Sequence, residues 1–181
     1  VAEMKDRSPF SVFRRRFPWL LATIASGTVC ALLVGFFEAT LAQSLILAFF
    51  LTLVLGLGES VSMQTMAITV HFMHHRSAQS GWYFEVLRRE LIRTLLLALA
   101  CGVIVGAIAW LWRGEAAAAF VIGFGIFLSL LLAGFIGVSV PSLLHRLKLD
   151  LRVASGPLTL ALADICTVVA YFSLATKILV P

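Results

Sequence analysis

Residues 117–144 read AAAFVIGFGIFLSLLLAGFIGVSVPSLL, and this whole stretch contains no charged side chain. A helix needs about 20 predominantly apolar residues to cross the hydrocarbon core of a bilayer. The stretch exceeds that length, whereas a surface helix of a soluble protein keeps polar residues on its outer face. It therefore predicts a transmembrane helix.

The composition extends this conclusion to the whole chain. Of the 181 residues, 61% are hydrophobic and only 13% are charged, and the mean hydropathy is +1.02. So little polar surface cannot coat a soluble globule. We expect an all-α integral membrane protein in which residues 18–181 form one domain of five transmembrane helices. Their predicted positions are residues 18–37, 41–70, 91–112, 117–144 and 156–180.

The basic residues predict the orientation of these helices. Twelve of the 14 Lys and Arg residues precede the first span or lie between spans two and three or four and five, and only Arg113 and Lys177 lie opposite. By the positive-inside rule, we expect a cytosolic N-terminus and an extracytoplasmic C-terminus. The membrane that we expect is the inner (plasma) membrane. A net charge of +5 that flanks apolar spans does not indicate nucleic-acid binding. Val1 is not an initiator Met, so we expect a piece of a longer chain.

Three local patterns refine the expected helices. Residues 81–94 alternate aromatic and aliphatic residues with Glu and Arg at helical spacing, which predicts an amphipathic helix in the inner interface. Gly56 and Gly58 are the expected weak point of the long second span. Small residues four apart, at Gly102 and Gly106 and in residues 133–137, predict close helix packing.

Two acidic residues lie inside the predicted spans. Asp164 is about eight residues, roughly 12 Å, into the fifth span, and Glu59 is at comparable depth in the second. Each carboxylate costs roughly 2.5 to 3.5 kcal/mol at a helix centre, and no Lys or Arg lies at that depth. A bound divalent cation would compensate both charges. Two protonated, hydrogen-bonded acids or a proton relay are the alternatives.

Further oxygen atoms surround these two carboxylates in the sequence. Ser60 and Gln64 follow Glu59 on the second span, and hard cations prefer such oxygen ligands. In the fifth span, Ser155-Gly156-Pro157 is expected to open the helix, and Leu160 offers a carbonyl one turn before Asp164. Glu38 falls at the extracellular mouth, where it would either concentrate cations or be solvated.

The chain resembles the MgtE family of magnesium channels and transporters over residues 9–180. Residues 16–20 (RFPWL) and 35–38 (GFFE) resemble the entry and exit of that family's first span. Residues 56–64 take the place of its Gly-Gly-Asn-x-Gly-x-Gln element, and residues 153–164 are similar to its fifth-span pattern, Ser-x-Pro followed by Asp. Asp164 thus matches the pore aspartate.

The resemblance implies an assembly larger than this chain. It implies a homodimer with a pore at or near the two-fold axis. It also implies an upstream cytosolic regulatory domain that is joined to the pore by a connecting helix, and residues 1–17 would be the last part of that helix. Glu59 stands where the family has Gly, Ser60 where it has Asn, and Ser62 where it has Gly. Two extra carboxylates per dimer would deepen the electrostatic well of the pore.

We therefore expect a channel or transporter for divalent cations, with Mg²⁺ first and Mn²⁺, Ca²⁺ or Zn²⁺ as other candidates. No catalytic step is expected, and the alternatives are a Na⁺- or H⁺-coupled exchanger and a non-conducting assembly subunit. Two weaker patterns compete for a chemical role. The spacing of His71, His74 and His75 would suit a transition metal but also solvated histidines. Residues 56–59 (GLGE) superficially resemble the GxGD of intramembrane aspartyl proteases.

Overall fold

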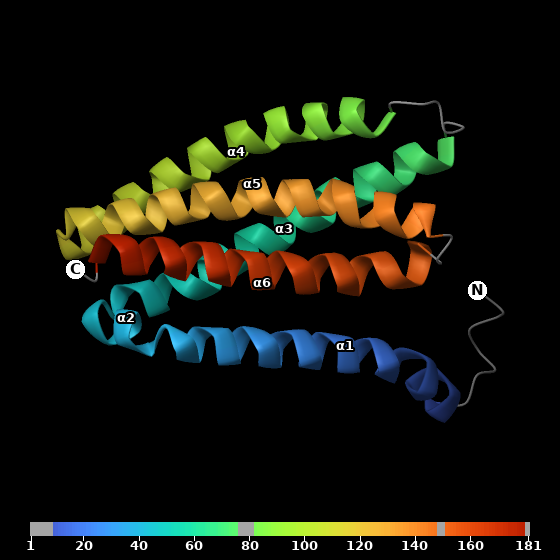
Figure 1. Ribbon diagram of the computed structural model, residues 1–181, viewed down its shortest axis with the longest axis horizontal. Helices are drawn as coiled ribbons and strands as arrows, with labels where there is room; N and C mark the ends of the chain where they lie inside the picture. The colour runs from blue at the N-terminus through green and yellow to red at the C-terminus, as the bar shows by residue number, and fades with distance from the viewer. Residues whose placement is uncertain (1–8, 76–81, 148–150, 180–181) are drawn as a thin grey trace.

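The computed structural model describes residues 9–75, 82–147 and 151–179, and all regular secondary structure in these ranges is helical. The helices follow one another as α1 (Pro9–Phe36), α2 (Glu38–Gln43), α3 (Ile46–His75), α4 (Trp82–Arg113), α5 (Ala116–Arg146) and α6 (Leu151–Leu179). Figure 1 shows that the long helices run roughly side by side, with α3 crossing α5 and α6 obliquely.

The predicted all-α membrane architecture is confirmed. Helices α3, α4, α5 and α6 are each long and apolar enough to cross a bilayer, and α1 contributes a shorter apolar segment, Leu20–Phe36. These five helices correspond to the five predicted spans. Their outward surfaces carry many exposed leucine, isoleucine and phenylalanine side chains, as expected where lipid is the solvent.

Helix α5 lies at the centre of the bundle. It packs against α3, α4 and α6, and its side chains at Val121, Ile122 and Ile126 are fully buried. Among the described residues, helix α1 packs mainly against α6 and lies at the edge of the bundle (Figure 1). This arrangement leaves part of α3 exposed in the single chain.

The predicted start of the second span is wrong, because residues 41–70 belong to two helices, α2 and α3. Helix α2 ends at Gln43, and Ser44 adopts an extended backbone with φ −141° and ψ 87° before α3 begins. The Thr40 hydroxyl lies 2.8 Å from that of Thr176 in α6, and the Phe37 ring stacks on Phe172. These contacts with α6 hold α2 across the end of the bundle. Helix α3, by contrast, continues unbroken through Gly56 and Gly58.

Two further helix starts differ from the prediction. Residues 82–94 do not form a separate interfacial helix, since they are the first turns of α4. Helix α6 begins at Leu151, so Pro157 lies inside the helix instead of opening it. A proline inside a helix lacks the N–H that would bond the carbonyl four residues earlier, and the carbonyl of Val153 is freed in this way.

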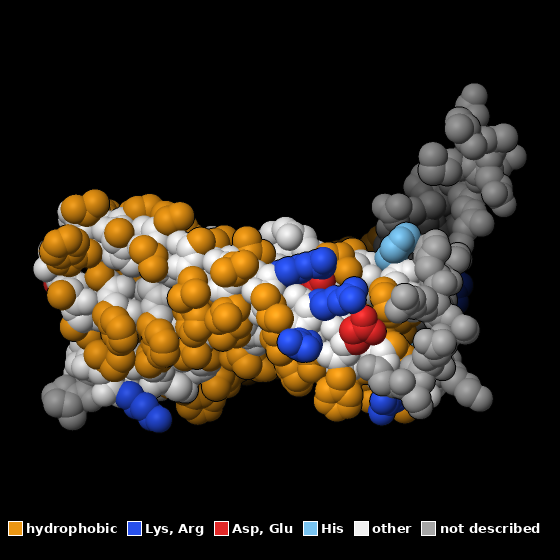
Figure 2. Space-filling view, turned by 90° about the horizontal axis from the view of Figure 1, so that it is seen from above, with side chains coloured by type: hydrophobic (Ala, Val, Ile, Leu, Met, Phe, Trp, Pro, Cys, Tyr) orange, Lys and Arg blue, Asp and Glu red, His pale blue; other side chains and the backbone are white. Residues whose placement is uncertain are grey.

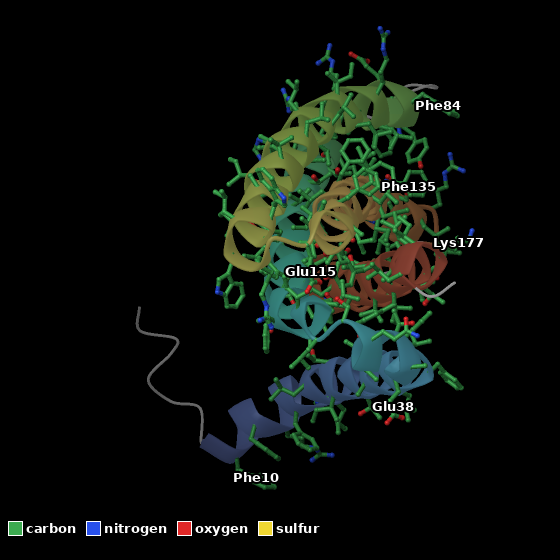
Figure 3. All side chains as sticks on the ribbon, turned by 90° about the vertical axis from the view of Figure 1, so that its left-hand side faces the viewer. Phe10, Glu38, Phe84, Glu115, Phe135 and Lys177 are labelled. Atoms are coloured by element: carbon green, nitrogen blue, oxygen red, sulfur yellow. The ribbon has the colours of Figure 1, made fainter. Side chains whose placement is uncertain are left out.

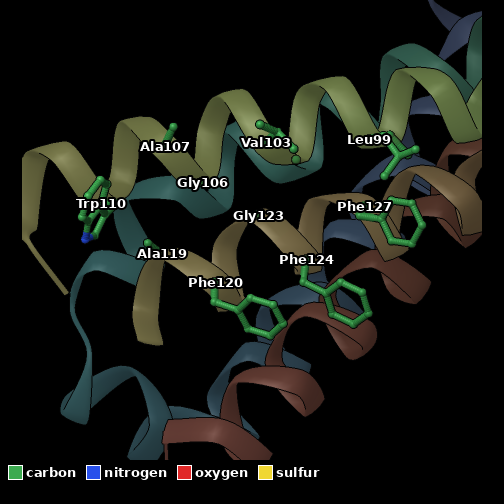
Figure 4. Close-up of a pocket in the computed structure, with 12 residues that line it drawn as sticks. Leu99, Val103, Gly106, Ala107, Trp110, Ala119, Phe120, Gly123, Phe124 and Phe127 are labelled. Carbon is green, nitrogen blue, oxygen red and sulfur yellow. The ribbon is translucent and has the colours of Figure 1, made fainter. Parts of the chain in front are cut away.

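The small residues permit close helix packing, as predicted. A Cβ added to Gly102 of α4 would lie 2.6 Å from the carbonyl oxygen of Gly123 in α5, and one added to Gly137 would lie 2.7 Å from that of Ser62 in α3. Beside the α4–α5 crossing, Figure 4 shows an apolar groove of about 450 Å³, bordered by Phe120 and Phe124. Backbones can approach this closely only where side chains are minimal.

Candidate ion pathway

The two intramembrane carboxylates lie at matching depth on neighbouring helices. Glu59 is 13 residues from the start of α3 at Ile46, and Asp164 is 15 residues from the end of α6 at Leu179. At 1.5 Å per residue, they lie about 20 Å and about 22 Å from the same end of the bundle. The equal depth expected from the sequence therefore holds, although α6 begins earlier than predicted.

Close contact between α3 and α6 brings these carboxylates together. A Cβ added to Gly58 would lie 3.2 Å from the hydroxyl oxygen of Thr167, which lies one turn beyond Asp164. Glu59 is the next residue after Gly58, and its carboxylate is within electrostatic range of Asp164. Neither carboxylate forms a salt bridge with any residue that the structure describes. Two carboxylates thus lie within electrostatic range of each other and form no salt bridge with a described cationic side chain.

A polar strip continues from Glu59 along the uncovered face of α3. Glu59, Ser60 and Gln64 are exposed, and the Gln64 amide donates a hydrogen bond of 3.1 Å to the Ser60 hydroxyl. The Ser62 hydroxyl is turned inward and donates to the carbonyl of Glu59 at 3.0 Å. Exposed polar side chains in the middle of a membrane helix need water or protein beside them. The strip therefore borders a hydrated space or a further protein surface.

The remaining predicted ligands are placed less favourably. Helix α6 is continuous, so the Leu160 carbonyl accepts the backbone N–H of Asp164 and keeps one lone pair for an ion. Glu38 is exposed at the first residue of α2, near the end of the bundle where Figure 3 also labels Glu115. Glu38 lies two residues before Thr40, and Thr40 contacts Thr176, which lies 12 residues after Asp164 in α6. Glu38 is therefore about 18 Å from Asp164 along the helix axis. Glu38 is therefore not part of the central group.

The described residues of the chain do not form a dense metal site. Among the described residues, no group of three or more His, Cys, Asp or Glu side chains could hold one metal ion. The structure does not describe the side chains of His74 and His75. The side chain of His71 is exposed. The histidine hypothesis therefore stays a prediction.

Two features of the site escape the sequence interpretation. Cys30 of α1 is half-buried within electrostatic range of Asp164, which adds a third helix to the surroundings of that carboxylate. Glu90, assigned from the sequence to a polar segment, is only 5% exposed and pairs with Arg93 at 2.5 Å. The four-residue spacing of Val86, Glu90 and Thr94 is the signal that places Glu90 on the buried face of α4.

Known proteins with similar sequences are membrane transporters. A family model described as "MgtE: Divalent cation transporter" matches residues 51–174. Over 94–96% of this chain, it is 29% identical to the magnesium transporter MgtE of Bacillus subtilis, 25% to that of Enterococcus faecalis and 27% to that of Thermus thermophilus. The chain spans 38% of the length of each relative. Because the family model covers more than half of its residues, the chain belongs to the MgtE family of divalent cation transporters.

Proposed function

We propose that this chain forms the membrane pathway of a Mg²⁺ transporter, with Asp164 as its central cation-binding group. The single observation that carries this proposal is that Asp164 and the exposed Glu59 lie at matching depth and within electrostatic range of each other. Residues 17–75 and 153–176, which contain both acids, include no Lys or Arg. A cation from solution is the simplest compensation for two like charges at membrane depth that have no cationic side chain in their segments.

The pathway proposed here runs along α3 and α6 and is completed by a second copy of the chain. The uncovered strip at Glu59, Ser60 and Gln64 supports this arrangement, because lipid cannot satisfy those polar groups. A two-fold axis close to α3 would enclose the strip between two protomers. Leu160 contributes a carbonyl oxygen, and Glu38 attracts cations at the entrance.

A hydrated ion is the species that fits this pathway. With Mg–O distances near 2.1 Å, hexahydrated Mg²⁺ is about 7 Å across, so the carboxylates hold it mainly through its waters. We place the end carrying Arg88, Arg89, Arg93 and Arg146, hereafter the arginine end, in the cytosol. A potential of about 100 mV, negative inside, then favours entry of a doubly charged ion by roughly 4.6 kcal/mol. Mn²⁺, Ca²⁺ and Zn²⁺ are competing ions.

The regulatory part of the transporter is proposed to precede this chain. The relatives are much longer than the matched region, and α1 begins with charged residues before its apolar segment. A cytosolic domain joined to α1 would act on α6, the helix that α1 contacts and that carries Asp164. Truncation upstream of α1 should therefore change the dependence of flux on internal Mg²⁺.

Flux measurements in liposomes test the proposal through Asp164→Asn. This substitution keeps the side chain's size and removes its charge, so Mg²⁺ uptake should fall at least about tenfold, as for the loss of one charge-assisted contact. Glu115→Gln is the matched control, because Glu115 is an exposed acid in the α4–α5 connection. It should transport normally.

Undiminished Mg²⁺ flux through the Asp164→Asn protein, at equal reconstitution, would refute the assignment. A loss of helix content or of the monodisperse size-exclusion peak would show instead that Asp164 serves folding. Imposed Na⁺ or H⁺ gradients distinguish a channel from a coupled exchanger, since only the exchanger responds beyond the electrical effect.

A further inference from the structure

A second polar site lies at the arginine end, away from the proposed ion path. A cavity of about 320 Å³ opens between the start of α4 and the end of α5. Its walls are formed by one tyrosine and one arginine, two serines and two apolar side chains: Tyr83, Phe135, Ser139, Ser142, Leu143 and Arg146. None of these residues belongs to α3 or α6, so the cavity is independent of Asp164 and Glu59.

The hydrogen bonds within the cavity determine what it can offer a ligand. The Ser142 hydroxyl donates to the carbonyl of Val138 at 2.6 Å and has no proton to spare. The hydroxyls of Tyr83 and Ser139 are 3.0 Å apart, and one of them donates to the other, which leaves a single hydroxyl proton free. The Arg146 guanidinium adds up to five N–H donors. Donors that surround one cationic group favour an anion.

The charges around the cavity strengthen this preference. Arg89 pairs with Glu85 at 2.8 Å and Arg93 pairs with Glu90, so the two acids that the structure describes near the cavity are neutralised. Arg146 forms no ion pair within the described residues. Figure 2 shows most of the charged side chains of one face in a single group right of centre, with one basic side chain near the left-hand end. The region therefore carries excess positive charge.

The depth and the apolar walls indicate the class of anion. Arg146 is the last residue of α5 and lies near the start of α4, where Trp82 stacks on Phe72. Aromatic residues of this kind mark the headgroup level of a bilayer. Phe135 lies 11 residues earlier in α5, about 16 Å deeper along the helix, and is 45% exposed. Figure 3 shows Phe135 on the flank of the bundle between α4 and α6. A ligand held at Arg146 can thus extend into the hydrocarbon along Leu143 and Phe135.

We propose that this cavity binds the phosphate of an anionic phospholipid. The guanidinium of Arg146 binds two phosphate oxygens, the free hydroxyl proton of the Tyr83–Ser139 pair binds a third, and an acyl chain lies along Leu143 and Phe135. A zwitterionic headgroup would bring its ammonium group toward the excess positive charge and is disfavoured. The lipid would join the start of α4 to the end of α5, beyond their close contact at Thr94 and Gly134.

Native mass spectrometry of the delipidated protein, titrated with phosphatidylglycerol or with phosphatidylethanolamine of the same acyl chains, tests this site. Arg146→Gln should weaken phosphatidylglycerol binding about fivefold, the usual effect of one cation close to an anionic lipid surface. Ser139→Leu fills the cavity without changing the charge, and it should weaken phosphatidylglycerol binding by a similar factor. Arg88→Gln is the matched control, since Arg88 is exposed at the same end but does not line the cavity.

Each outcome decides the proposal. Selective loss in Arg146→Gln and Ser139→Leu, with Arg88→Gln unchanged and both variants still monodisperse, supports it. An equal loss in Arg88→Gln shows diffuse attraction and overturns it, as does unchanged binding in Ser139→Leu. Displacement of the lipid by millimolar inorganic phosphate would show a site for the free ion, and equal binding of both lipids would show that the charge is not recognised.

Discussion

Replacing Gly123 with Ala should destabilise the protein by forcing α4 away from α5. A Cβ at this position would lie 2.7 Å from the carbonyl oxygen of Gly102 and 3.3 Å from the Cα of Gly106. Both neighbours are backbone atoms, so no side-chain rotation relieves the overlap. Overpacking of this kind costs about 1–3 kcal/mol, and the better helix propensity of Ala returns up to about 1 kcal/mol.

Gly27→Ala is the control that isolates the packing cost. Gly27 lies in α1, and a Cβ added there meets no atom within 4 Å, so this variant gains propensity without overlap. Because the propensity gain is common to both variants, their difference in the free energy of unfolding should be the overlap cost, about 1–3 kcal/mol.

Thermal unfolding in detergent, followed by circular dichroism, measures this difference. At about 2–4 °C per kcal/mol for a chain of this size, Gly123→Ala should melt roughly 2–12 °C below Gly27→Ala. Equal melting temperatures for the two variants would refute the reasoning, since they would mean that α4 and α5 do not touch through their backbones at Gly102 and Gly123.

Three further predictions concern the ion path and its surroundings. The effects of Glu59→Gln and Asp164→Asn on Mg²⁺ affinity should be non-additive, with a coupling energy of about 0.5–3 kcal/mol. Mg²⁺ titrations of both single variants and the double variant measure this energy, and simple addition would mean separate sites. Met63→Cys, beside the exposed strip in a background lacking the native cysteines, should cross-link two protomers in membranes, and a monomer that still conducts would contradict this. Thr40→Val removes the hydrogen bond to Thr176 and should lower stability by about 1 kcal/mol, without loss of flux.

The spans and their order could be predicted from the sequence because hydropathy follows directly from the solvent. The ends of helices could not, because contacts with other helices decide them. The break at Ser44 depends on the contacts of Thr40 and Phe37 with α6, which no local pattern reveals. Helix α4 extends back to Trp82 because its amphipathic first turns pack on α5 through Val86 and Glu90.

The candidate site was predictable in part for the same reason. The depths of Asp164 and Glu59 follow from counting residues along a helix. Their proximity depends on α3 meeting α6 at Gly58 and Thr167, a tertiary contact that the glycine alone does not specify. The approach of Cys30 to Asp164 likewise depends on which face α1 turns toward α6.

The connection between α4 and α5 has a consequence for how the protein is made. Only Gly114, at φ +72°, and Glu115 separate the two helices, so Arg113 and Ala116 can never be more than about 11 Å apart. A connection this short favours entry of the two segments into the bilayer as one helical hairpin. Their contacts are local in sequence, so this hairpin can assemble before α6 is synthesised. Asp164 then enters a membrane in which α5, the helix it must pack beside, is already in place.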